Sequence, residues 1–443
     1  MSNPQISPIW KPLHGPTSIR LLTLYPGRFQ DHVEASLEEY DLRKDPYYEA
    51  ISYYWGRQMP EYNITVNGQV LQVRKNLYDF LRKLRSGSQN RILWVDAICI
   101  SQMDLEEKSQ QVRNIHHVFL QASCVHAWLG EHQNSSEVLF DPQEDDWQPH
   151  EGLFRKAWRL TFSPTPLRKL YDARRRRARI WIAFFERPYF SRRWIVQELV
   201  LARSIMVHCG TDERSWDELI GSRVNHQNFN GINFGISGDI YNPANKPFRK
   251  ATNNIRMLLM LRGEARTQKF ERDIFTLINM FSHTKCEDPL DQVYALLSLD
   301  DSSMSSQQDM QHYTAKRTGV IFPDYQKDMA DLFITVFTKR NCTDPIQLEP
   351  SLVNTENARR RSQISGRVRW NVDQVLVELG SQRALTAYHL LADLHLDEFE
   401  MKIVQERFRE AALKDHTGRL TAALSDTEKA IRFINRQRAS YQI

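Results

Sequence analysis

One glutamate in this sequence is set among apolar residues, where its carboxylate could do chemistry. The stretch RRWIVQELVLA, residues 192–202, is typical of an amphipathic helix. Spacings of three and four residues put side chains on one helix face. The apolar residues that share the face of Glu198 in this way are Trp194, Ile195, Leu201 and Ala202. Because an unpaired buried carboxylate is costly, this glutamate needs either a cationic partner or a ligand.

Two interpretations of Glu198 remain open from the residues alone. In the structural one, the carboxylate pairs with Arg192 or Arg193, or caps a neighbouring turn. In the functional one, it faces a ligand at the edge of a cleft. A carboxylate there can stabilise a developing positive charge or orient a water molecule. Trp194 is either a packing anchor or a ligand contact.

Further candidate residues lie at the end of one expected strand, and along and after a second. Ligands of open α/β sheets lie beyond the carboxyl ends of the strands. The candidates in these places are Ser52, Tyr53, Trp55, Gly56, Asp96 and Gln102. The aromatic rings can stack on a flat ligand, and the glycine permits a close approach of the backbone. The structural alternatives are core packing for the aromatics and, for Asp96, a hydrogen-bonded carboxylate that holds the following loop.

Hydrophobic patterning predicts the elements that would position these residues. Strands are expected within residues 18–27, 47–56, 91–100, 124–130 and 204–210, with a polar stretch between the first two. Asn67-Gly68 predicts a type I′ hairpin turn within 62–73. Asn76 is expected to cap a helix that runs to residue 85, and Asp104 with Glu107 has capping-box-like spacing for a helix that ends near Gln121.

The alternation of strands and helices predicts an α/β layer with crossover helices. The expected organisation is an N-terminal strand with a polar lead-in over 1–45, then a parallel-sheet module over 46–214 with an insertion at about 131–170, a helical region over 215–330, and a helical C-terminal region over 331–443.

Composition favours a soluble, cytoplasmic protein. No apolar stretch approaches the roughly 20 residues that span a bilayer, and the N-terminus has no signal-peptide core. The five cysteines are scattered and form no C-x-x-C pair, so neither a disulfide framework nor a metal site is expected. The basic run at 174–179 is interpreted as a solvated or acid-pairing face, with a nucleic-acid patch as the weaker alternative.

Several separated blocks, in the same order, resemble the HET (heterokaryon-incompatibility) domain of filamentous fungi. They are YEAISYYWG (48–56), VNGQVLQVRKNLYDFLRKLR (66–85), RILWVDAICISQMDLEEKSQQV (91–112), AWLGE (127–131), RPYFSRRWIVQELVLA (187–202), DPLDQVYALLSL (288–299) and PDYQKDM (323–329). Tyr54 stands where the family more often has Val, and Ser101 where it more often has Asn.

The resemblance implies non-self recognition that ends in cell death, a form of innate immunity. It also implies a remote, TIR-like (flavodoxin-like) fold, and some TIR domains cleave NAD⁺ with a glutamate in a W-x-x-x-E-like stretch. Trp194 and Glu198 have that spacing. NAD⁺ would then be the substrate, with no other cofactor, and Tyr53 or Trp55 would stack on its nicotinamide or adenine ring. The implied partners are further copies of the chain and an incompatibility partner protein. The alternative is a non-enzymatic signalling scaffold.

Overall fold

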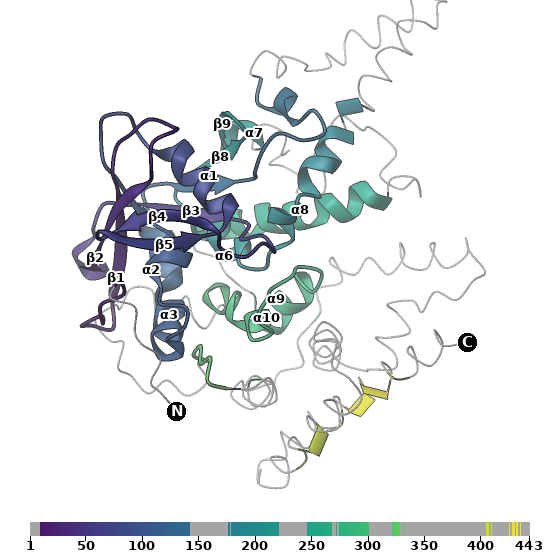
Figure 1. Ribbon diagram of the computed structural model, residues 1–443. Helices are drawn as coiled ribbons and strands as arrows, with labels where there is room; N and C mark the ends of the chain where they lie inside the picture. Colours follow the sequence, from purple (N-terminus) through teal and green to yellow (C-terminus); the bar gives the residue numbers. More distant parts are fainter. Residues whose placement is uncertain are drawn as a thin grey trace, which may run out of the picture. The chain divides into compact units, whose positions relative to one another are not determined.

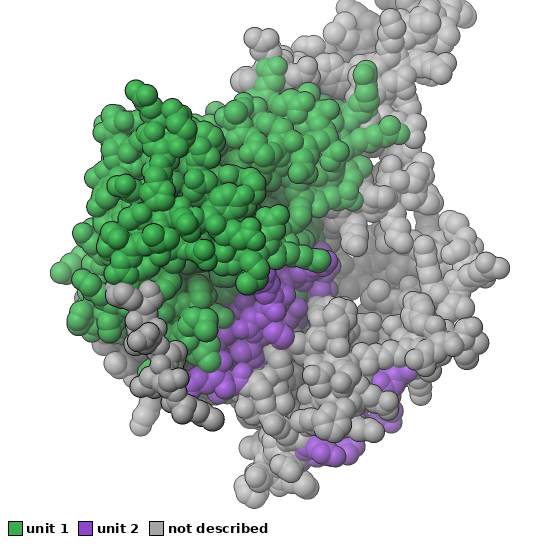
Figure 2. All heavy atoms as spheres, in the orientation of Figure 1, with its two compact units in different colours: residues 1–269 green, residues 270–443 purple. Residues whose placement is uncertain are grey.

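The computed structural model describes most of the first 300 residues and parts of the remainder. The described ranges are 9–141, 176–220 without 178, 246–267, 272–300 without 273, 321–327 and isolated residues beyond 331. The chain divides into two compact units, residues 1–269 and 270–443, which Figure 2 shows in green and purple. Most of the predicted insertion at 131–170 and nearly all of the predicted helical region beyond 331 lie outside the described residues.

The first unit is built on a nine-stranded sheet of order β5-β4-β2-β1-β6-β3-β7-β8-β9 (Figure 1). The strands are β1 (Ser18–Leu24), β2 (Glu34–Asp41), β3 (Glu49–Tyr53), β4 (Tyr62–Val66), β5 (Gln69–Val73), β6 (Arg91–Trp94), β7 (Val125–Trp128), β8 (Ile205–Cys209) and β9 (Asp212–Ser215). The prediction of an α/β layer is confirmed, but the sheet is mixed rather than wholly parallel.

Four neighbouring strands, β6-β3-β7-β8, are mutually parallel, and β2 and β4 form one further parallel pair. Taken in chain order, the four lie in the spatial order 2-1-3-4, so the chain passes from one side of β3 to the other. Strand β1 is antiparallel to both of its neighbours, β2 and β6, and two hairpins at the edges are antiparallel. The carboxyl ends of the four parallel strands therefore share one edge of the sheet.

Helices cover both faces of the parallel strands. Those of the first unit are α1 (Lys75–Leu84), α2 (Asp96–Cys99), α3 (Leu105–Gln121), α6 (Ile195–Leu201), α7 (Trp216–Leu219) and α8 (Lys246–Thr267). Phe80 of α1 stacks on Trp128, whereas Phe119 of α3 meets Trp94 edge-on. The two tryptophans pair with β3 positions three residues apart, so they point to opposite faces. Helix α6 packs against α3 and α8.

Local sequence signals account for two of these elements. Asn67 and Gly68 both have positive φ, 52° and 74°, which confirms the predicted type I′ turn between β4 and β5. Asp104 accepts hydrogen bonds from the backbone N–H groups of Glu106 and Glu107, at 3.1 and 3.0 Å. The predicted N-cap of α3 is therefore confirmed. The side chain of Glu107 does not complete a capping box, because it binds elsewhere.

Other local predictions were wrong. The strand expected over 91–100 ends at Trp94, and Asp96 opens the single turn of α2 by accepting a hydrogen bond from Ala97 N at 2.7 Å. Asn76 does not cap α1, which begins one residue earlier at Lys75. Its side chain instead accepts a hydrogen bond from Trp128 Nε1 at 2.7 Å and donates one to a backbone carbonyl. The polar stretch before residue 46 contains β2, whose outward side chains are mostly acidic.

Helix α6 also departs from its prediction. All seven of its residues are buried, so the expected polar face is missing. The cause is packing on several sides: α3 and α8 contact it, and it crosses between β7 and β8. Glu198 is thus enclosed within the first unit rather than at the margin of an amphipathic helix.

The second unit contains short helices in its described part, α9 (Ile274–Met280), α10 (Asp291–Tyr294) and the 3-10 turn η7 (Leu297–Leu299). The predicted turn at Asp288-Pro289 is present, since Asp288 accepts a hydrogen bond from Leu290 N at 3.0 Å. Tyr325 donates to Asp291 at 2.5 Å, which ties the segment 321–327 to α10. No described helix in either unit is long and apolar enough to span a bilayer.

We expect the parallel strands to need β1 and β2, because these two lie between β4 and β6 in the sheet. Removing residues 1–45 would expose the side of β6 that β1 covers and separate the β4–β5 hairpin from the sheet. The shortened chain should lose cooperative unfolding, measured by circular dichroism in urea. Removing only residues 1–8 is the control, and a cooperative transition in the longer deletion would contradict the expectation.

Candidate functional site

Glu198 is enclosed and paired. Its side chain is 5% exposed, and Arg192 holds both carboxylate oxygens, with Nη2 3.1 Å from Oε1 and Nη1 3.2 Å from Oε2. The hydroxyl of Ser52 donates a short hydrogen bond to Oε2. A forked guanidinium contact of this kind is a strong charge-assisted interaction. The partner that the structural interpretation requires is therefore Arg192.

Strand register explains why Ser52 reaches this carboxylate. Successive side chains of a strand point to opposite faces. Ser52 lies two positions after Ala50, which pairs with Trp94 on the face that α3 covers. Helix α6 packs against α3. The hydroxyl of Ser52 therefore points to the face that carries Glu198, at the carboxyl end of β3.

Tyr189 extends this hydrogen-bonded chain. It belongs to the 3-10 turn η4 (Pro188–Ser191), and its hydroxyl lies 2.7 Å from Ser52 Oγ. Burial, reinforced by the charge of Glu198, raises the pKa of Tyr189, so the phenol stays neutral and available for hydrogen bonding. Sequence reasoning missed this residue. Its signal was its place in the block RPYFSRRW, nine residues before the glutamate.

Asp96 is the second carboxylate of the site. It follows β6, the strand beside β3, and accepts hydrogen bonds from Trp55 Nε1 at 2.9 Å and from Ala97 N at 2.7 Å. Burial, together with the charge of Glu198, raises the pKa of Asp96 to about 6, although Arg192 and the hydrogen bonds act in the opposite direction. Its ionisation therefore falls near neutral pH, which is where a general base is useful.

Arg192 is the cation between the two carboxylates. Burial opposes its charge, but Glu198 and Asp96 outweigh that effect and raise the pKa of Arg192. Both carboxylates thus act on one guanidinium. A carboxylate held in this way can stabilise a ligand or transition state that carries positive charge.

Trp55, which donates to Asp96, and the adjacent Gly56 are held by Arg74. The guanidinium of Arg74 lies 5.3 Å from the centroid of the Trp55 ring, and its Nη1 donates to Gly56 O at 2.9 Å. Gly56 has a φ of 79°, a conformation that residues with a side chain rarely adopt. Trp55 itself is part-buried.

The remaining predicted residues play different parts. Gln102 donates from Nε2 to the backbone carbonyl of Asp96 at 3.0 Å and so braces α2. Tyr53 is buried, and burial raises its pKa. Trp194 is part-buried and directly precedes α6, where its carbonyl accepts from Glu198 N. The network thus connects Glu198 with Ser52, and Asp96 with Trp55 and Gln102, while Tyr53 fits the packing alternative.

The described residues contain no group of three or more His, Cys, Asp or Glu side chains arranged to hold a metal ion. The side chains of the group are two carboxylates, a guanidinium, two hydroxyls and an indole. They lie at the carboxyl ends of β3 and β6, on the segment that leads into α6 and, for Glu198, on α6 itself. Ligands of open α/β sheets bind beyond the carboxyl ends of the strands.

Comparison with known proteins gives two matches. Residues 48–198 match the family model described as "Heterokaryon incompatibility protein (HET)". The chain is 29% identical over 226 residues to "Heterokaryon incompatibility protein 6, OR allele" of Neurospora crassa. That alignment covers 44% of this chain and 33% of the relative, so the chain spans about a third of the protein it matches. No solved structure matches the chain.

Replacing Arg192 with Met should lower the free energy of unfolding by about 3 to 5 kcal/mol, because a buried carboxylate is left without its cation. Adding Glu198→Gln should restore part of that loss, giving a coupling of about 1 to 3 kcal/mol. Urea denaturation of the two single variants and the double variant at pH 7 measures this coupling. Simple additivity would show that the two charges do not stabilise each other.

The raised pKa of Asp96 predicts that this residue lowers the free energy of unfolding as pH rises. Its folded-state value of about 6 exceeds the ordinary 3.8, so its favourable contribution is complete below pH 3.8 and is lost as pH rises to about 6. Asp96→Asn should therefore become more stable relative to the original chain across that window, by up to about 1.4 kcal/mol per pH unit. Urea denaturation at several pH values tests this, and a pH-independent difference would contradict it.

Proposed function

We propose that this chain, which carries a HET domain over residues 48–198, cleaves NAD⁺ or a related nucleotide as its part in heterokaryon incompatibility, with Glu198 as the central residue. The supporting observation is the group of two carboxylates and one guanidinium at the carboxyl ends of β3 and β6. The role in incompatibility is supported by the family match and by the Neurospora crassa relative. Cell death is the proposed outcome of the cleavage.

The proposed reaction is hydrolysis of the glycosidic bond to nicotinamide. The nicotinamide ring is cationic while bonded and leaves as a neutral molecule, taking the bonding electron pair, so departure needs no general acid. The ribose carbon passes through an oxocarbenium-like state. Water then forms the new C–O bond and releases one proton. The products are nicotinamide, ADP-ribose and a proton.

Each residue of the site has a task in this scheme. Glu198 stabilises the positive charge that develops on the ribose, and Ser52 and Arg192 hold its carboxylate in one orientation. Asp96, ionised above about pH 6, accepts the proton from the attacking water. Trp55 offers a part-buried ring for stacking on a base. The electrostatic part of the effect depends on the preorganisation of these groups.

A TIR-like identity for the module is part of the same proposal. The order 2-1-3-4 of the four parallel strands is the order with which a flavodoxin-like sheet begins. The additional strands β1, β2, β4 and β5 on one side depart from such a sheet. Enzymes of this kind act as assemblies, so we include self-association, together with an incompatibility partner protein, in the proposal.

A non-enzymatic signalling scaffold is the second candidate, and one observation favours it. Arg192 and Ser52 already engage both oxygens of Glu198, so the carboxylate is satisfied without a ligand. In a scaffold, this group would serve only to join α6 to β3 and η4, and signalling would proceed through association of folded copies.

Glu198→Gln separates the two functions. A glutamine oxygen in the place of Oε2 still accepts hydrogen bonds from Ser52 and Arg192 Nη1, whereas the contact of Arg192 Nη2 is lost. We therefore expect a destabilised but folded variant, checked by circular dichroism, whose neutral side chain stabilises an oxocarbenium-like state poorly. With both chains fused to an oligomerising module and given NAD⁺, release of nicotinamide should fall by about 100-fold or more. Chromatographic measurement of nicotinamide provides the readout.

The matched control is Glu106→Gln, which changes an exposed glutamate in the first turn of α3. It should release nicotinamide at the rate of the original chain. If the folded and assembled original chain releases none, the enzyme proposal fails and the scaffold is favoured. If Glu198→Gln releases as much as the control, cleavage occurs but Glu198 is not its central residue.

A further inference from the structure

Helix α2 carries Asp96 but has little stability of its own. It is a single turn of four residues, Asp96–Cys99, and isolated short helices are marginal in water. Its internal support consists of bonds such as Cys99 N to Val95 O at 2.7 Å. The position of the Asp96 carboxylate therefore depends on contacts that α2 receives from other parts of the fold.

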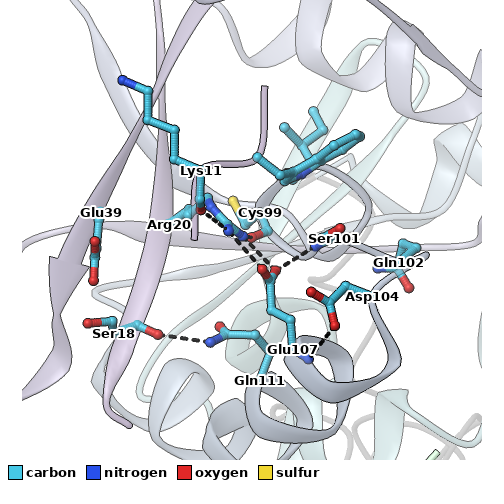
Figure 3. Close-up of polar contacts among 12 residues, drawn as sticks. Lys11, Ser18, Arg20, Glu39, Cys99, Ser101, Gln102, Asp104, Glu107 and Gln111 are labelled. Carbon is cyan, nitrogen blue, oxygen red and sulfur yellow. Dashed lines mark hydrogen bonds and ion pairs between the residues drawn. The ribbon is translucent and has the colours of Figure 1, made fainter. Parts of the chain in front are cut away.

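Two of these contacts come from a buried ion pair that joins β1 to α3, which Figure 3 shows. Arg20 and Glu107 form two parallel hydrogen bonds, 2.6 and 2.8 Å long, and their side chains are only 4% and 12% exposed. Each partner also holds the exit from α2. Arg20 Nη1 donates to Cys99 O at 3.1 Å, and Glu107 Oε1 accepts from Ser101 N at 2.8 Å.

The N-terminal segment supplies a third contact. Trp10 Nε1 donates to Ile98 O at 2.7 Å. The carbonyl of Lys11 accepts a hydrogen bond from Arg20, as Figure 3 shows. Two successive carbonyls of α2, those of Ile98 and Cys99, are thus bound by side chains that precede the region matching the HET model. Trp10 and Arg20 are thus far from Asp96 in sequence but bind the helical turn that carries Asp96.

We propose that Trp10, Arg20 and Glu107 are positioning residues that clamp α2 and thereby set the place of Asp96 beside Trp55. The proposal deepens the proposed function, because it assigns the control of one carboxylate of that site to residues outside it. A buried ion pair is weak evidence for stability but can specify one conformation. Here the ion pair would specify the conformation of the one-turn helix α2, whose Asp96 carboxylate accepts a hydrogen bond from Trp55.

The clamp can be weakened without dismantling the core. Trp10→Phe removes the indole N–H that reaches Ile98 O and keeps a smaller aromatic ring. Arg20→Lys keeps the charge but cannot bind Glu107 and Cys99 O with a planar fork. Gln110→Ala is the matched control, because Gln110 Nε2 donates to Gly15 O at 2.9 Å. That change also removes a contact to the N-terminal segment, but one that does not involve α2.

Two measurements on the full chain report on the clamp, hydrogen exchange at residues 98–101 and titration of the Asp96 carboxyl followed by NMR. In Trp10→Phe and Arg20→Lys, exchange there should be about five- to ten-fold faster, as expected for one lost hydrogen bond. The Asp96 titration should move below about 6, toward its ordinary value, as water reaches the carboxyl. Gln110→Ala should change neither quantity.

Equal effects in all three variants, or none in Trp10→Phe and Arg20→Lys, would overturn the clamp. Its fate is separate from that of the proposed function, because neither measurement requires turnover. If the original chain does release nicotinamide, the two clamp variants should also shift the acidic limb of its pH–rate profile to lower pH. A uniform loss of rate with an unshifted profile would show a structural role alone and overturn positioning.

Discussion

The structure depends on one requirement: the carboxylate of Glu198, on a helix whose residues are all buried, must be neutralised. Glu198 meets this requirement through Arg192 and Ser52, so two parts of the chain far apart in sequence must converge: the end of β3 and the segment that runs from η4 through α6. The rest of the site follows from that convergence. The same guanidinium lies near Asp96, and the hydroxyl chain continues to Tyr189.

Strong local signals made much of the fold predictable. Asn67-Gly68 specifies its hairpin because both positions require positive φ, and Asp104 specifies the start of α3 because its side chain satisfies two free N–H groups. The four parallel strands were recognisable as apolar runs. Strand β2 was not, because its outward residues are mostly acidic and its inward ones are few, so its pairing with β1 is a tertiary effect.

Most residues of the candidate site were predictable, but Tyr189 and the arrangement were not. Glu198 stood out because a carboxylate among apolar residues is unusual, Ser52 because it lies at the end of an expected strand, and Asp96 because it interrupts one. No spacing rule links Ser52 to Tyr189, which are 137 positions apart. The hydrophobic pattern also could not reveal that Arg20 holds α2. The apolar run at 91–100 is compatible with either a strand or a one-turn helix.

The ion pair of Glu198 and Arg192 constrains which substitutions can accumulate at these two positions. A substitution that removes one partner leaves the other buried and unpaired, so it damages the fold as well as the site. A lineage that gives up this site would therefore be expected to replace both residues, through a destabilised intermediate. Natural copies that keep only one of the two charges should be scarce, and paired replacement at these positions would mark an allele that has abandoned the site while keeping its fold.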